Sequence, residues 1–173
     1  MFLELIAIFI AGIAAAGLTL LVNRFLGGRL PRWMAPVAAG GVMILVAVFS
    51  EYGWFARTEA ALPEGLVVAQ TVEEKALYRP WTYVWPYVDR FVAVDTATAR
   101  THPKHPGIKL TQVYFFGRWA PVNEMMVLTD CVAEKRAALA DASSFEADGS
   151  IDGTEWVAVS PEDPIVTTVC GTT

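Results

Sequence analysis

The chain has 173 residues, 54% of them hydrophobic, and a formal net charge of −5 at pH 7. Only one of its 18 acidic residues and three of its 13 basic residues precede position 51, so the remainder carries a formal charge of −7. An acidic domain of this kind repels the phosphates of nucleic acid, which is therefore not an expected partner, and it attracts a basic protein.

Two apolar runs, residues 2–22 and 33–49, dominate the first fifty positions. As helices, each is about long enough to cross the hydrocarbon layer of a bilayer. The first run lacks the basic leading segment of a signal peptide, so we expect an uncleaved span. The second is interrupted by Pro36 and Gly40 and needs a packing partner. Residues 1–50 are therefore predicted to form a transmembrane helical hairpin.

Small residues spaced four apart let helix backbones approach closely in a membrane. In these runs they join either the two spans to each other or the hairpin to a lateral partner. The candidates for helix packing are Ala11, Gly12, Ala15, Ala16 and Gly40.

Arg24, Arg29 and Arg32 lie in the connection, residues 23–32, which has no acidic residue. Short connections rich in arginine stay in the cytoplasm, so both termini are predicted to lie outside, which is the periplasm of a bacterium. Glu4 would then lie near the outer mouth of the first span. There it either reaches water or marks an ion path or a subunit contact.

Both cysteines, Cys131 and Cys170, belong to the part predicted to be exported. Disulfides form in oxidising compartments, so we expect these two residues to be bonded. The alternative is a pair of buried free thiols.

Residues 51–65 are predicted to form an interfacial connector, and residues 66–173 a small α+β domain with a mainly antiparallel sheet and one or two short helices. The spacing of Thr71 and Glu74 suggests a capping box for a short helix to residue 78, and Asp130 suggests a cap for a helix over 131–140. Strands are expected at 66–70, 91–99, 108–119, 121–129, 155–159 and 165–170.

Four aromatic residues, Trp81, Tyr83, Trp85 and Tyr87, occupy every second position of one stretch. If this stretch is extended, all four rings project from one face, and Pro86 restricts it to a sheet edge. The four are our candidates for partner binding. They could contact a protein, stack on sugar rings or lie against lipid headgroups, or they could instead form the core of the sheet.

No metal site and no cofactor is predicted. His102 and His105 stand in a proline-rich turn without further ligands nearby in sequence. Asp148, Ser150, Asp152 and Gly153 match an EF-hand loop in part, but its twelfth position is Val159, where calcium requires a bidentate glutamate. A weak, irregular calcium site is the alternative there.

The sequence also lacks a phosphate-binding glycine loop, a nucleophile elbow and paired-cysteine redox or haem motifs, so it does not predict an enzyme. It favours a non-catalytic accessory subunit of a larger bacterial inner-membrane complex, with a respiratory complex preferred. The acidic domain would contact other integral membrane subunits or a basic electron carrier such as cytochrome c. The alternative is a free-standing, membrane-anchored periplasmic binding module for a glycan or small ligand.

Overall fold

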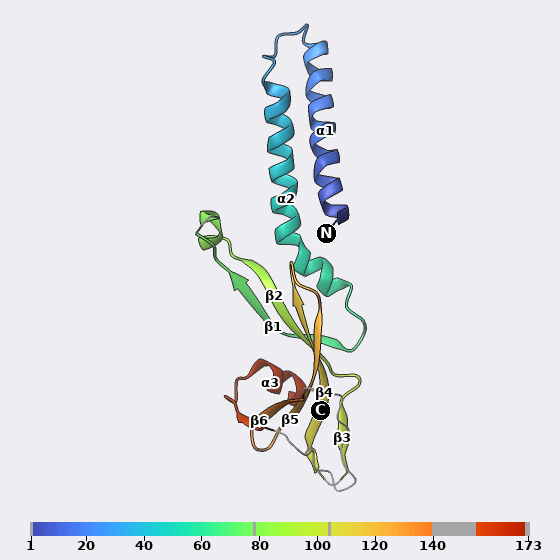
Figure 1. Ribbon diagram of the computed structural model, residues 1–173, viewed down its shortest axis with the longest axis vertical. Helices are drawn as coiled ribbons and strands as arrows, with labels where there is room; N and C mark the ends of the chain where they lie inside the picture. The colour runs from blue at the N-terminus through green and yellow to red at the C-terminus, as the bar shows by residue number, and fades with distance from the viewer. Residues whose placement is uncertain (1, 78, 104, 140–154, 172–173) are drawn as a thin grey trace. The chain divides into compact units, whose positions relative to one another are not determined.

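The computed structural model describes residues 2–77, 79–103, 105–139 and 155–171 (Figure 1). The chain divides into two compact units, Met1–Arg57 and Thr58–Thr173. Two long apolar helices are followed by a curled antiparallel sheet and a short C-terminal helix. This order confirms the predicted combination of a helical pair and a mainly antiparallel α+β domain in outline.

The first unit is built on α1 (Phe2–Phe25) and α2 (Met34–Ala60), and both helices are long and apolar enough to cross a membrane. Helix α1 ends where Gly27 and Gly28 adopt positive φ angles of 69° and 78°, which glycine tolerates at little cost. Helix α2 is longer than the apolar run that predicted it. It continues through residues 51–60, which the sequence analysis assigned to a connector.

The two helices approach closely at Gly12, the buried residue of α1. A Cβ atom at this position would lie 2.7 Å from Met43 Cγ, so a larger residue would displace the methionine. This contact joins the two helices of the hairpin, and it is possible because glycine has no side chain. The other candidate packing residues are half-buried: Ala11, Ala15, Ala16 and Gly40.

Polar groups join the first turn of α1 to α2. The Ser50 hydroxyl donates a hydrogen bond of 2.9 Å to Glu4 Oε1, and Arg57 Nη2 lies 3.7 Å from the same oxygen. Arg57 also donates to the Ser50 carbonyl oxygen at 3.1 Å. Glu4 is therefore held by partners on the second helix.

The second unit contains a seven-stranded sheet in which every neighbouring pair is antiparallel. The strand order is β1-β2-β4-β5-β6-β7, and β3 pairs with β4 beyond the end of β2. The strands are β1 (Leu66–Glu74), β2 (Tyr87–Asp95), β3 (Arg100–His102), β4 (His105–Gly117), β5 (Asn123–Asp130), β6 (Lys135–Leu139) and β7 (Val157–Ala158).

Both predicted helices in the middle of the domain are wrong. Residues 71–74 continue β1, because β2 pairs with them and supplies the backbone hydrogen bonds that a capping box would otherwise have provided. Asp130 does accept backbone hydrogen bonds, from Val132 at 2.9 Å and Ala133 at 3.0 Å. These bonds close a turn in which Glu134 has a φ of 52°, and the chain then enters β6.

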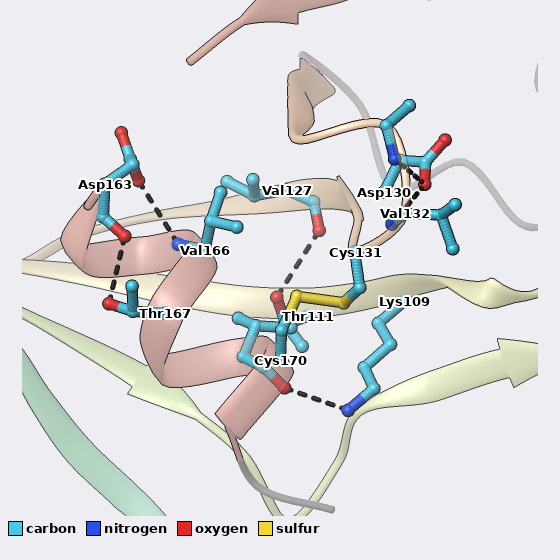
Figure 2. Close-up of a disulfide and its surroundings, with 12 residues drawn as sticks. Lys109, Thr111, Val127, Asp130, Cys131, Val132, Asp163, Val166, Thr167 and Cys170 are labelled. Carbon is cyan, nitrogen blue, oxygen red and sulfur yellow. Dashed lines mark hydrogen bonds between the residues drawn. A yellow bond between two sulfur atoms is a disulfide. The ribbon is translucent and has the colours of Figure 1, made fainter. Parts of the chain in front are cut away.

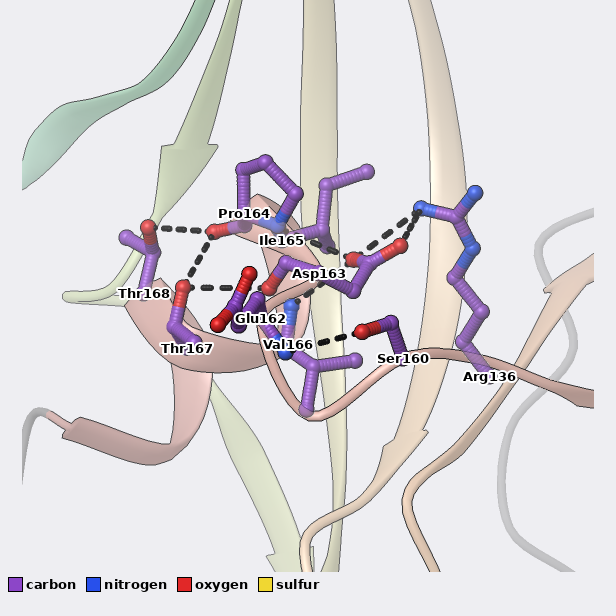
Figure 3. A network of polar contacts seen from close by, with 9 residues as sticks. All are labelled: Arg136, Ser160, Glu162, Asp163, Pro164, Ile165, Val166, Thr167 and Thr168. Atoms are coloured by element: carbon purple, nitrogen blue, oxygen red, sulfur yellow. Dashed lines mark hydrogen bonds and ion pairs between the residues drawn. The ribbon is translucent and has the colours of Figure 1, made fainter.

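The segment 165–170, predicted as a strand, is instead part of helix α3 (Pro164–Gly171). Asp163 caps this helix, because its Oδ1 accepts hydrogen bonds from the backbone N–H groups of Ile165 and Val166 at 3.0 and 3.2 Å (Figure 3). Proline is favourable at the first helical position that follows such a cap. Arg136 of β6 also forms an ion pair with Asp163 at 3.1 Å. The residues between the two predicted strands, 160–164, therefore lead into a helix.

Helix α3 covers one face of the sheet and completes a hydrophobic core. Its buried residues Ile165 and Val169 pack on strand residues Val94, Val113 and Val127. A second buried cluster lies on the opposite face of the sheet, which is formed by the alternate residues of the same strands. Its members are Leu110, Leu128, Ala137 and Leu139.

Cys131 and Cys170 form the expected disulfide, but the elements that it joins differ from those predicted. The bond connects the turn after β5 to the last turn of α3 (Figure 2). Beside it, Lys109 Nζ donates a hydrogen bond of 2.9 Å to the carbonyl oxygen of Val169. A cation is favourable at the negative end of a helix. Both ends of α3 are thus attached to the sheet.

Candidate interaction surface

The four aromatic residues do not form a row on one face of a strand. Residues Pro80–Tyr83 fold into a 3-10 helix, η1, within the connection between β1 and β2, and only Tyr87 belongs to a strand. The predicted extended geometry is therefore wrong for this stretch. Proline favours the first position of η1 because it needs no hydrogen-bond donor there.

Thr82 holds the connection in a compact form. Its side chain is almost completely buried, with 1% exposed, and its hydroxyl donates to the Arg79 carbonyl oxygen at 2.7 Å. The hydroxyl oxygen of Thr82 in turn accepts the backbone N–H of Ala76 at 3.0 Å. The backbone N–H of Trp85 also donates to the carbonyl oxygen of Trp81 at 2.9 Å. The loop thus has its own internal hydrogen bonds.

Tyr87 lies at the base of this loop and is only 6% exposed. Its hydroxyl donates to Glu74 Oε2 at 3.5 Å, across the β1–β2 pair. The guanidinium carbon of Arg79 lies 5.7 Å from the centre of the Tyr87 ring, which is within range of a cation–π interaction. Tyr87 therefore packs inside the base of the loop and is not available to a partner.

The other three aromatic residues are exposed, together with two aliphatic residues that the sequence analysis did not single out. We call residues 75–77 and 79–86 the aromatic tip. Its exposed apolar side chains are Leu77, Trp81, Tyr83, Val84 and Trp85, with Leu77 exposed to 88% and Trp85 to 67%. Water-exposed apolar side chains gathered on one loop are typical of a binding surface.

A second loop, residues 118–122 between β4 and β5, also exposes large apolar residues. Trp119 and Val122 are exposed, and the guanidinium carbon of Arg118 lies 4.8 Å from the centre of the Trp119 ring. The backbone N–H of Arg118 donates to the Asp89 carbonyl oxygen at 2.9 Å, which attaches this loop to β2. We call it the β4–β5 loop.

A hollow of about 280 Å³ lies beside the β4–β5 loop and is lined by residues of that loop and of the neighbouring strands. Its walls include the stacked rings of Phe91 and Phe116, whose centres are 4.6 Å apart. Arg90 and Asn123 are the polar residues in its lining. Arg90 also contacts Asp89 at 3.3 Å, and 68% of its side chain is exposed.

One titratable group near this end of the sheet has a perturbed pKa. Burial raises the pKa of Tyr114 above its ordinary value of 10.0, and the negative charges of Glu124 and Asp95 raise it further. Glu124 is the cross-strand neighbour of Tyr114. A more weakly acidic tyrosine stays neutral at physiological pH, so it contributes no charge to this surface.

Within the part of the chain that the structure describes, no three His, Cys, Asp or Glu residues are grouped so that they could hold a metal ion. His105 begins β4, opposite residue 102 of β3. The partial EF-hand match at Asp148, Ser150, Asp152 and Gly153 lies outside the described residues.

Leu77, Val84, Trp119 and Val122 are the surface residues that sequence reasoning missed. A usable signal was present, because residues 75–86 and 117–123 combine large apolar residues with Lys75, Arg79 and Arg118 and contain no acidic residue. In a domain with a charge of −7, such segments stand out.

No family model matches the chain, and neither a curated protein nor a solved structure matches it significantly. The assignment of this surface therefore depends on the chemistry of the chain itself.

Proposed function

We propose that this protein is a non-catalytic accessory subunit of a larger bacterial inner-membrane complex. Helices α1 and α2 are its two membrane spans, the arginine-bearing connection between them lies in the cytoplasm, and the disulfide-bonded domain lies in the periplasm. The hydropathy and length of the two helices support their insertion. The arginines of the connection support the orientation.

The observation that carries the proposal is the aromatic tip. Exposing Leu77, Trp81 and Trp85 to water is unfavourable, and a domain on which nothing covers them gains nothing from it. The internal hydrogen bonds of Thr82 keep the loop folded in the exposed state. A surface that is preformed in this way loses little conformational entropy on binding. The tip therefore suits docking of the domain on the outer face of the membrane that holds such an assembly.

The net negative charge of the domain favours a second contact, with a basic partner. Opposite charges accelerate association and select partners, so a basic periplasmic protein, such as a cytochrome c in a respiratory complex, is the partner that this charge favours. Because exposed charges are screened over about 10 Å at 0.1 M salt, its association should weaken as salt is added.

The proposal is tested by extracting the native membrane in a mild detergent and purifying the protein through a C-terminal tag. We expect stoichiometric co-migration with larger multi-span proteins, identified by mass spectrometry. A second preparation from cells with an untagged protein controls for adhesion to the resin. Recovery of the tagged protein as a lone monomer or homodimer would refute the accessory role.

The hollow beside the β4–β5 loop favours a second candidate, a membrane-anchored periplasmic module that binds a small ligand. Its stacked phenylalanines offer apolar walls, and Arg90 and Asn123 offer hydrogen-bond donors. The glycan alternative is weakened, because Tyr87 is buried and the other three rings do not share one extended face. Replacing Phe116 with Ala should abolish ligand binding under this second candidate and leave co-purification unchanged.

A further inference from the structure

We propose that the aromatic tip and the β4–β5 loop together bind the headgroup layer of the lipid bilayer. This inference rests on the proposed insertion of α1 and α2, and it names the component of the membrane surface that the tip contacts. It gives the domain a second attachment to the membrane, separate from the helices.

Both loops lie at the same end of the sheet. In the β2–β4 pair, Arg90 is opposite Gly117, the last residue of β4, while the aromatic tip immediately precedes β2. In the β4–β5 pair, Phe115 is opposite Asn123, the first residue of β5. The two loops therefore extend past the same ends of neighbouring strands, and in Figure 1 this end lies away from α3.

The side chains that the two loops expose are those that prefer a membrane interface. Tryptophan and tyrosine collect at the headgroup level, where an apolar ring and a polar N–H or O–H group are both accommodated. Trp81, Tyr83, Trp85 and Trp119 are exposed at this end, and Leu77 and Val84 add aliphatic surface that can enter the acyl boundary.

Charge favours lipid as the occupant. The aromatic tip contains Lys75 and Arg79, the β4–β5 loop contains Arg118, and neither contains an acidic residue. Basic residues beside a bilayer are attracted to anionic headgroups within a Debye length of the surface. The acidic remainder of the domain is repelled by the same headgroups. The two effects favour the same orientation, with this end of the domain toward the membrane.

The length of the connecting chain permits the contact. From Ser50 to Ala60 α2 rises about 16 Å, and residues 61–65 add at most about 17 Å. Strand β1, with nine residues, is about 30 Å long and ends at the tip. A strand of this length can return the tip to the bilayer from which the helix emerges.

The test uses the full chain in nanodiscs that contain phosphatidylcholine and phosphatidylglycerol, with and without bromine atoms on the acyl carbons nearest the headgroups. Bromine quenches tryptophan emission at short range. The emission of Trp81 and Trp85 is obtained as the difference between the wild-type protein and the variant carrying Trp81→Phe and Trp85→Phe. Trp156→Phe is the matched control, because Trp156 is exposed to 38%, close to the 44% of Trp81, but directly precedes β7, the strand at the opposite edge of the sheet.

We expect the emission of Trp81 and Trp85 to be lost in brominated discs and that of Trp156 to be unchanged. Emission of Trp81 and Trp85 that is equal in brominated and ordinary discs would overturn the inference. Lys75→Gln, or discs of phosphatidylcholine alone, should reduce the loss; an undiminished loss in both would overturn the role given to charge.

The experiments can refute lipid binding without refuting the accessory role, and the reverse. Unquenched tryptophans together with a stoichiometric complex in native membranes would mean that the tip faces a protein subunit, which refutes lipid binding and keeps the accessory role. Quenched tryptophans in a protein that purifies alone would keep lipid binding and refute the accessory role.

Discussion

Replacing Asp163 with Ala should destabilise the C-terminal domain by about 2 kcal/mol. The change removes the N-cap of α3, because Oδ1 accepts the backbone N–H groups of Ile165 and Val166, and loss of such a cap costs about 1 kcal/mol. It also removes the ion pair with Arg136, in which the Asp163 side chain is 12% exposed and that of Arg136 37%. A charge-assisted contact of this partial burial contributes about 1 kcal/mol more.

Asp163→Asn separates the two contributions, since its amide oxygen can still cap the helix but carries no charge. We expect it to cost about 1 kcal/mol, half the effect of the alanine variant. Both are measured by urea unfolding of the purified full chain in detergent, with the disulfide intact, from the near-UV circular dichroism of the domain. Equal losses for the two variants would refute the cap, and unchanged midpoints for both would refute the attachment of α3 to the sheet at this end.

Three further predictions concern other contacts. Replacing Cys131 and Cys170 with Ser should lower the free energy of unfolding by about 4 kcal/mol, as the loop-closure model gives for a separation of 39 residues; a loss below about 1 kcal/mol would contradict it. Gly12→Leu should separate α1 from α2 by displacing Met43, seen as a lower crosslinking yield between cysteines placed on the two helices. Gly17→Leu should leave this yield unchanged, because a Cβ atom added at Gly17 would have no other atom within 4 Å. Because the folded state raises the pKa of Tyr114, stability should be full below about pH 10 and should fall as pH rises through the folded-state pKa; Tyr114→Phe should remove part of that fall in alkaline unfolding experiments.

The helical hairpin and most strands could be predicted from local pattern. Hydropathy identified α1 and α2, and runs of β-branched and aromatic residues located β2, β4 and β5. These elements are long and their patterns agree with their burial. The end of α2 was missed because residues 51–60 are polar enough to resemble a connector, yet they contain no proline and continue the helix to Ala60.

The errors arose where local chemistry permits two structures. Asp130 and Asp163 both precede backbone N–H groups that they can cap, but the first closes a turn and the second begins a helix. Tertiary contacts decide between the two outcomes. After Asp130, β6 pairs with β5, whereas after Asp163, Ile165 and Val169 pack on an apolar face of the sheet.

The surface was predicted in its residue type but not in its geometry. Period-two aromatic spacing suggested a strand, whereas the contacts of Thr82 with Ala76 and Arg79 fold the same residues into a compact loop. Such contacts depend on three-dimensional proximity, so spacing alone could not reveal them. Trp81, Tyr83 and Trp85 are exposed in the folded loop, and Tyr87 is not.

The position of α3 has a consequence for biogenesis. The core that includes Val94 and Val113 is closed by Ile165 and Val169, which are synthesised some seventy residues later than Val94. Under the proposed topology, most of the domain passes through the translocation machinery before this core can form. Until Cys170 has also been exported under that topology, the Cys131 thiol can form disulfides with other proteins. Oxidative folding catalysts and holding chaperones would accordingly influence the yield of this domain more than its final stability suggests.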